Sequence, residues 1–333
     1  MNGTVLNPDA PAFLLFKLRY IGDVLLTTPA IRLLKRSYPK CHITMVVNKG
    51  TEDVLRYNPH LDRILTVDRS TGLAGAWRLL RALRERRYDV SVDFASGDRV
   101  AWLSLLAGVP RRIALWSPEG VRRFLNNEQM RAPAVPFHIA EMYLSFVERG
   151  LAIKANDRSL ELPVGGEDEK AAAALLRQHG VNDPFIALHV GGRSNAQYRW
   201  PRERWMEFAQ AVGRTHRLTP VFVGGPDCLD DVNWIVSQPD LRAIPLVGQT
   251  TVLELAAVLK RASGFVGIAS GPMHMAAAVG ARVVALFVDD AAWRPWGQGH
   301  VILRVGRDSL QRPVEVTEVV EAVGNLPCKK IIS

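Results

Sequence analysis

The stretch FLLFKLRYIGDVLLTTPAIRLLKRS, residues 13–37, decides the fold class. It begins with an apolar run, Phe13–Lys17, which is typical of a buried strand, and Gly22 and Asp23 follow shortly after it. From Asp23 to Ser37 apolar residues recur at helical spacing, so we expect one helix over 23–37. A buried strand that passes through a turn into a helix is the unit from which parallel α/β sheets are built.

The same alternation of strand and helix patterns continues along the whole chain. In the first half we predict further strands at 43–47, 63–67 and 90–93. In the second half we predict strands and helices in turn, at 185–190, 201–214, 220–223, 251–261, 265–268, 272–279 and 282–288. The segment ELPVGGEDEK, 161–170, mixes proline, paired glycine and acids and is the best candidate for a linker. We therefore predict an α/β protein with two doubly wound domains, 1–160 and 161–333, that face each other across a cleft.

The segment 73–87 is arginine-rich. Helical spacing places Leu73, Trp77, Leu80 and Leu83 on one face, and Arg78, Arg81, Arg84 and Arg86 largely elsewhere. Such a helix can lie against an anionic membrane surface. We interpret the arginines instead as a solvated helix flank.

The positive charge of the chain is concentrated in its first half. Residues 1–160 contain 24 Lys/Arg and 15 Asp/Glu, and residues 161–333 contain 18 of each, so the net charge of +9 belongs to the first half. A one-sided basic surface attracts anionic partners such as phosphorylated substrates, lipid headgroups or nucleic acid. No nucleic-acid recognition motif accompanies the charge, so we predict no nucleic-acid partner.

Several classes of protein are disfavoured by missing patterns. The three cysteines lie far apart and form no metal-ligand spacing, which argues against disulfides and structural zinc. The first apolar run is interrupted by Lys17 and Arg19 and does not resemble an export signal, so we expect a cytoplasmic protein. The first strand–helix turn is not GxGxxG, and GxxxxGK[ST] and Asp-x-Asp are both missing. A dinucleotide-binding dehydrogenase and a P-loop enzyme are therefore disfavoured, and no metal is expected.

Three stretches of the second half have the pattern of anion-binding loops. HVGGRS, 189–194, and VGGPD, 223–227, follow predicted strands, where open α/β sheets bind ligands. GIASGPMHMAAAVG, 267–280, contains a helix start at Ser270-Gly271-Pro272, and the amide groups and dipole of such a start suit a phosphate. A plain capped helix with a buried His274 fits the last stretch equally well. For WRPWG, 293–297, we predict a structural role.

Taken together, these motifs resemble glycosyltransferase family 9, the bacterial heptosyltransferases. The stretches FKLRYIGDVLLTTPAIRLLKRSYP, NKGTEDVLRYNPHLDRIL, HVGGR…RWPRERW, VGGPD, ASGPMHMAAAVG and WRPWG occur in the family's order over nearly the whole chain. RYIGDVLLTTP, GTEDVLRYNP and WRPWG are most similar to the heptosyltransferase III branch.

The resemblance implies a GT-B fold of two Rossmann-like domains and an inverting, metal-independent glycosyl transfer without a cofactor. The first domain would bind the inner core of lipopolysaccharide, at the cytoplasmic face of the inner membrane and with peripheral contact to its inner leaflet. The second would bind ADP-L-glycero-D-manno-heptose. The family's Gly-Asp falls on Gly22-Asp23, which implies that Asp23 is the general base. From the residues alone, the alternative is that Asp23 caps a helix or lies favourably at its dipole, and we predict the base.

The predicted contacts divide between the two substrates. For the donor we predict Gly191, Gly192, Arg193, Arg199, Asp227, Ser270, Gly271, Pro272, Met273 and His274. For the acceptor we predict Arg19, Gly22 and Lys49.

The chain departs from the family pattern at two positions. Tyr198 stands where the family commonly has lysine, and Ala269 stands where it usually has aspartate. Two alternatives therefore stay open, a transferase of the same fold with another nucleotide sugar and a catalytically degenerate binding protein.

Overall fold

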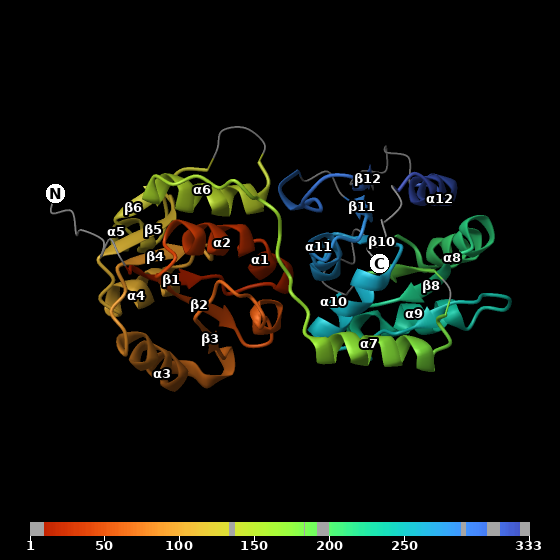
Figure 1. Ribbon diagram of the computed structural model, residues 1–333, viewed down its shortest axis with the longest axis horizontal. Coiled ribbons are helices and arrows are strands. Elements are labelled where there is room, and N and C mark those ends of the chain that lie inside the picture. The colour runs from red at the N-terminus through yellow and green to blue at the C-terminus, as the bar shows by residue number, and fades with distance from the viewer. Residues whose placement is uncertain are drawn as a thin grey trace. The chain divides into compact units, whose positions relative to one another are not determined.

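The computed structural model describes residues 10–132, 137–182, 184–191, 200–287, 291–304 and 314–326, and the chain divides into two compact units, Met1–Glu161 and Leu162–Ser333. Each unit contains one six-stranded sheet (Figure 1). Every pairing between these strands is parallel. Because parallel sheets are covered on both faces, their central strands are buried along their whole length, and this is why their apolar runs could be found in the sequence.

Unit 1 has the strand order β3-β2-β1-β4-β5-β6. Its strands are β1 (Ala12–Phe16), β2 (His42–Asn48), β3 (Arg63–Val67), β4 (Val90–Asp93), β5 (Arg111–Leu115) and β6 (Glu128–Met130). Its helices are α1 (Ile21–Leu25), α2 (Thr28–Ser37), α3 (Gly72–Arg84), α4 (Asp98–Leu106), α5 (Arg122–Leu125) and α6 (Ile139–Leu151). Helices α2 and α6 cover one face of this sheet, and α3 and α4 cover the other (Figure 1).

Unit 2 repeats this order in its own strands, as β12-β11-β10-β7-β8-β9. The strands are β7 (Phe185–His189), β8 (Thr219–Phe222), β9 (Ile244–Pro245), β10 (Gly264–Ile268), β11 (Val283–Phe287) and β12 (Val301–Arg304). The helices are α7 (Gly166–Gln178), α8 (Arg202–His216), α9 (Leu229–Val236), α10 (Val252–Arg261), α11 (Gly271–Ala278) and α12 (Val316–Gly324). Helices α8, α9 and α12 share one hydrophobic core with the sheet.

Both sheets therefore have a switch point, where the chain leaves one side of the sheet and continues on the other. In unit 1 it lies between β1 and β4, where Phe16 is level with Asp93. In unit 2 it lies between β7 and β10, where His189 is level with Gly267. Ligands of open α/β sheets bind outside the carboxyl ends of the strands at such points, so these two edges are where a site is expected.

The single helix predicted over 23–37 is wrong in one respect, because the structure divides it into α1 and α2. Pro29 lies in the first turn of α2, where its ring and missing N–H favour a helix start. The hydroxyls of Thr27 and Thr28 donate to the carbonyl groups of Val24 and Leu25, 2.7 and 2.8 Å away. These bonds satisfy the carbonyl groups at the end of α1.

The apolar stripe that helical spacing predicts for the arginine-rich segment is only partly buried in the structure. Leu79 and Leu83 are buried against the sheet, but Trp77 is exposed. The predicted spacing selected a stripe that is rotated from the buried one, because both stripes of this helix contain large apolar residues. The tryptophan thus lies on the outer side of α3.

Candidate functional site

The carboxyl edge of unit 1 carries a buried ion pair at its switch point. Lys17 follows β1 directly, and its Nζ lies 2.8 Å from Oδ1 of Asp23 in α1. The two side chains are only 11% and 15% exposed. The Lys17 ammonium also donates to the carbonyl of Phe94 (3.3 Å) and lies 5.1 Å from the ring centre of Tyr143 in α6. A charge so poorly solvated needs several partners, and this one has three.

Asp23 lies in the first turn of α1, and its surroundings argue against both structural roles considered for it, the helix cap and the helix dipole. The residue before the helix, Tyr20, makes no side-chain cap, and the Asp23 carboxylate is turned to Lys17. The helix has only five residues, so its dipole is small. Helix capping therefore does not account for Asp23, and the ion pair with Lys17 does.

A second carboxylate, Asp93, ends β4 beside this pair and was not singled out in the sequence. Its Oδ1 accepts the backbone N–H groups of Ala95 and Ser96, at 2.7 and 2.8 Å. Burial raises the pKa of Asp93 to about 6, although those hydrogen bonds and the charge of Lys17 act in the opposite direction. Ser96 has a φ of 54°, in the left-handed region, which turns the loop so that its N–H reaches the carboxylate.

Tyr143 completes the cluster from the helix that returns over the sheet. Its phenol is buried, and burial together with the nearby charges of Asp23 and Asp93 raises its pKa, so it stays protonated at neutral pH. Its ring packs on Phe94 with the ring centres 5.1 Å apart. The edge thus holds two carboxylates, one ammonium and one neutral phenol, which is the composition of a proton-transfer site.

The residues predicted to contact the acceptor lie at this same edge. Arg19 lies between β1 and α1, and Gly22 is the second residue of α1. Lys49 follows β2, the neighbour of β1. Gly22 is buried within α1, whereas Arg19 and Lys49 are exposed. Lys49 lies 3.5 Å from Asp68 across the surface. Arg19 and Lys49 thus add exposed positive charge beside the ion pair.

In unit 2 the loops after β7, β8 and β10 converge at the corresponding edge. Gly191 has a φ of +89°, and a Cβ built on it would lie 2.2 Å from Cδ1 of Ile268, the last residue of β10. The Cys228 thiol donates to the Gly191 carbonyl over 3.3 Å. Gly224, with φ +144°, leaves room for His189, whose Nδ1 would lie 2.8 Å from a Cβ there. The glycines are needed for this close approach of three loops.

The helix start predicted at 270–272 is confirmed as the beginning of α11. Ser270 precedes the helix in an extended conformation, and Pro272 is in its first turn. The Ser270 hydroxyl donates to the Ile268 carbonyl (3.0 Å) and makes no capping bond to α11. Met273 and His274 are buried one turn into the helix. Asp227 is exposed in the short 3-10 turn after Gly225.

Three of the predicted donor residues, Gly192, Arg193 and Arg199, lie outside the described residues, as does Tyr198. Cys41 and Cys228 are both buried. Among the described residues, no three His, Cys, Asp or Glu side chains are placed to hold a metal ion together. In the same part of the chain, no helix is both long and apolar enough to cross a bilayer.

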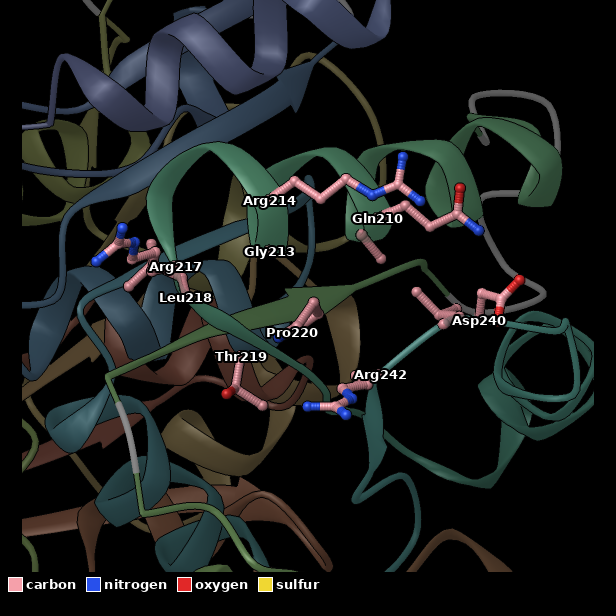
Figure 2. A pocket seen from close by; sticks show the side chains of 11 residues that line it. Gln210, Gly213, Arg214, Arg217, Leu218, Thr219, Pro220, Asp240 and Arg242 are labelled. Carbon is pink, nitrogen blue, oxygen red and sulfur yellow. The ribbon is translucent and has the colours of Figure 1, made fainter.

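Unit 2 also has a cavity of about 300 Å³, but it lies at the amino-terminal end of β8, away from the carboxyl edge of the sheet. Thr219 and Pro220 line it at the start of β8, whereas Gly224 follows the far end of that strand. Figure 2 shows the side chains of Arg214, Arg217 and Arg242 pointing in different directions from its rim. Their charges do not converge on one point, so this cavity does not compete with the edge described above.

The fold and the two switch-point edges define an α/β enzyme of the GT-B class. Comparison with known proteins gives the family. The model of "Glycosyltransferase family 9 (heptosyltransferase)" matches residues 76–320, and the chain belongs to this family. It is thus a glycosyltransferase, as the motifs indicated.

Individual relatives agree with this assignment. Lipopolysaccharide heptosyltransferase 3 of Escherichia coli (strain K12) is 28% identical over 297 residues, 85% of each chain. The lipopolysaccharide core heptosyltransferase OpsX of Haemophilus influenzae is 24% identical over 84% of this chain and 80% of its own. The crystal structure of a family 9 glycosyl transferase from Veillonella parvula is 24% identical, with a TM-score of 0.86, and covers 96% of this chain and 98% of its own. The structure of E. coli heptosyltransferase WaaC with ADP is 16% identical, with a TM-score of 0.77, and the match covers 95% of this chain and 100% of its own.

Proposed function

We propose that this enzyme transfers heptose from ADP-L-glycero-D-manno-heptose to the inner core of lipopolysaccharide, with inversion at the anomeric carbon and without a metal ion. The names of its relatives support the donor and acceptor classes, since they include lipopolysaccharide heptosyltransferases and a structure with ADP. The observation that carries the mechanism is the Lys17–Asp23 ion pair at the switch point of unit 1.

In this proposal unit 1 binds the acceptor and supplies the base. The Asp23 carboxylate removes the proton of an acceptor hydroxyl while that oxygen forms a bond to the anomeric carbon of the heptose. The bond between this carbon and the β-phosphate oxygen breaks, and ADP leaves with the electron pair. Attack from the face opposite the leaving group inverts the anomeric centre. Lys17 fixes the orientation of the carboxylate through the 2.8 Å contact.

The exposed cations of the same edge suit an acidic acceptor. Arg19 and Lys49 lie beside Gly22-Asp23, and the net charge of +9 falls in the first half of the chain. An anionic inner core would be attracted to this surface before it is positioned at the base.

Unit 2 would bind the donor at its own switch point. The start of α11, at Ser270–His274, and the backbone of the Gly191 loop would hold the diphosphate, with Arg193 and Arg199 neutralising its charge. Asp227 would accept a hydrogen bond from the ribose. The increase of charge on the leaving ADP is then offset by amide dipoles and arginines, and no metal ion or cofactor is required. We place the reaction at the cytoplasmic face of the inner membrane.

The test is a transfer assay with ADP-heptose and deacylated lipopolysaccharide core in the presence of EDTA. We expect release of ADP together with an acceptor that is heavier by one heptose. The anomeric configuration of the transferred heptose, assigned by NMR, should be opposite to that of the donor. Loss of activity in EDTA that added Mg²⁺ restores would contradict metal independence. ADP release without an acceptor product would contradict the proposal that the lipopolysaccharide core is the acceptor.

Ala269 and Tyr198 favour a second candidate, a transferase of the same fold with another nucleotide sugar. A thermal-shift series of ADP- and UDP-sugars distinguishes the two, because a ligand that binds the native state raises its melting temperature. A shift with ADP-heptose that exceeds the shift with every UDP-sugar supports the first proposal. The reverse order supports the second.

A further inference from the structure

Unit 1 exposes an unusual number of large apolar side chains in one part of its chain. Among the described residues, eleven large hydrophobic residues are exposed, and seven of them fall between Trp77 and Phe124. The most exposed of these seven are Phe124 (74%), Trp77 (66%) and Trp102 (46%). Single exposed apolar residues are normal on a protein surface, but a concentration of them marks a contact with a partner or a membrane.

Helix α4 shows the feature most clearly. Its inner side, with Val100 and Leu103, packs in the core of unit 1 together with α3. Its outer side presents Arg99, Trp102, Leu105 and Leu106, all exposed. A surface helix that is apolar on both sides lacks a cover for its outer side.

Helices α3 and α5 continue this outer side. Both α3 and α4 lie on the same face of the sheet (Figure 1), and Nε of Arg84 at the end of α3 donates to the carbonyl of Leu106 (2.9 Å). At the other end, the N–H of Arg122 in α5 donates to Asp98, the first residue of α4 (3.1 Å). The three helices are therefore contiguous. We call their exposed residues the aromatic–arginine surface: Trp77, Trp102, Leu105, Leu106, Phe124, Arg78, Arg81, Arg84, Arg99 and Arg123.

The charge of this surface selects its partner. Residues 72–131 contain eleven arginines, no lysine and six acidic residues. Three of the acids are already paired, Glu85 with Arg63, Asp98 with Arg122 and Glu128 with Arg111. The Arg123 guanidinium lies 4.4 Å from the ring centre of Phe124, so an apolar group and a cation are presented together. Aromatic rings between arginines match the interface of an anionic bilayer, where rings enter the headgroup region and cations remain at the phosphates.

We propose that the aromatic–arginine surface binds the protein to an anionic lipid bilayer. The proposal deepens the function proposed above, since α4 begins directly after the β4 edge where Asp93 lies, so that a lipid-linked acceptor held in the bilayer would be presented near that edge. The binding itself requires neither donor nor turnover. A second copy of the chain is the other possible cover for this surface, and the experiment includes it as an outcome.

The experiment is sedimentation of the full chain with vesicles of phosphatidylethanolamine and phosphatidylglycerol, and separately with vesicles of phosphatidylcholine. We expect binding to the anionic vesicles, a several-fold weaker association with phosphatidylcholine, and release by high salt. The variant W77A/W102A/F124A should reduce the partition coefficient at least tenfold. The variant R78Q/R81Q/R99Q should also reduce it at least tenfold, because each arginine lost should weaken binding about fivefold. These side chains are exposed, so the fold should tolerate the changes.

Matched controls remove the same chemistry elsewhere. The variant Y57A/L229A/I302A deletes three exposed apolar side chains, and R214Q/R217Q/R242Q deletes three exposed arginines of unit 2. Both controls should bind vesicles as the unchanged protein does. Wild-type protein that does not sediment with anionic vesicles, or variants and controls that bind alike, would overturn the proposal. An aromatic variant that turns a dimer into a monomer in analytical ultracentrifugation, with vesicle binding unchanged, would overturn it in favour of self-association.

The two proposals fail separately in this design. Transfer to a deacylated, water-soluble core tests the enzyme without a membrane. Vesicle sedimentation tests the surface without a sugar donor. A protein that binds vesicles and transfers no heptose would contradict the proposed heptosyl transfer and leave the proposed membrane surface standing.

Discussion

The two units of this enzyme have the same strand order but opposite chemistry at their switch points. In unit 1 the edge beside β1 and β4 carries Lys17, Asp23 and Asp93, that is, one ammonium and two carboxylates. In unit 2 the edge beside β7 and β10 is formed by glycine loops and the start of α11. One topology thus supports side chains that move a proton in one unit and backbone that approaches an anion in the other.

This difference predicts that the two edges respond to different kinds of substitution. Unit 1 should be sensitive to loss of charge, because its buried ionic groups depend on one another. Unit 2 should be sensitive to added volume, because its loops approach too closely for a Cβ.

The largest effect on stability is expected for Lys17→Ala. It leaves the Asp23 carboxylate without its 2.8 Å partner in a poorly solvated place, and should lower the free energy of unfolding by about 3 kcal/mol in urea titrations. The control Lys170→Ala removes an exposed pair with Glu167 and should change it by less than about 0.5 kcal/mol. Equal losses of unfolding free energy in the two variants would contradict a buried ion pair between Lys17 and Asp23.

Asp93→Asn should change the pH dependence of stability. The pKa of Asp93 is raised by burial to about 6 from 3.8, so the folded protein keeps this proton longer than the unfolded chain does. As pH rises from about 4 to 6, the wild type should therefore lose about 3 kcal/mol of stability that the variant keeps. The measurement is the difference between the two unfolding free energies at each pH. A difference that is flat across this range, or that has the opposite sign, would contradict the assignment.

Gly191→Ala should destabilise unit 2 by about 1–3 kcal/mol, because a side chain at φ +89° is strained and its Cβ meets Ile268. If the donor loop is where we propose, the dissociation constant for ADP should rise as well, measured by calorimetry. The control Gly166→Ala has an ordinary φ and open space around its Cβ, and should leave both quantities nearly unchanged. Normal ADP affinity in a folded Gly191→Ala protein would remove this loop from the donor site.

The smallest effect is expected for Lys49→Gln. Its side chain is exposed and its contact with Asp68 is 3.5 Å, so stability should change by less than about 0.5 kcal/mol. The KM for a phosphorylated core should rise a few-fold, and the ratio of variant to wild type should approach one at high salt. An unchanged KM at low salt would remove Lys49 from the acceptor site.

The sequence predicted the central strands because they are buried on both faces and appear as continuous apolar runs, whereas the edge strand β6, Glu-Gln-Met, is only partly buried and was not predicted. The strands predicted at 63–67 and 90–93 are observed over those residues. Strand order was not predicted, because pairing joins residues far apart in the chain. The division of 23–37 was missed although Pro29 and the two threonines signalled it.

The site was predicted only in part. Asp23 could be found because a glycine and an acid interrupt an apolar helix, and the start of α11 because Gly-Pro follows a strand. Lys17 directly follows β1 and Asp93 ends β4, 76 residues further along the chain, and nothing local marks either of them as a neighbour of the other. A charged residue at the end of an apolar strand, as in VSVD over 90–93, is the signal that would have found them.

The central claim is that the base belongs to unit 1 and the donor site to unit 2, and Asp23→Asn tests it most directly. The variant keeps the size of the side chain and removes the base, so single-turnover transfer with saturating ADP-heptose should slow 10²–10⁴-fold. The dissociation constant for ADP should stay within about twofold of the wild type, since donor binding would not involve Asp23. Near-normal transfer, or a loss of ADP affinity as large as the loss of rate, would contradict the claim.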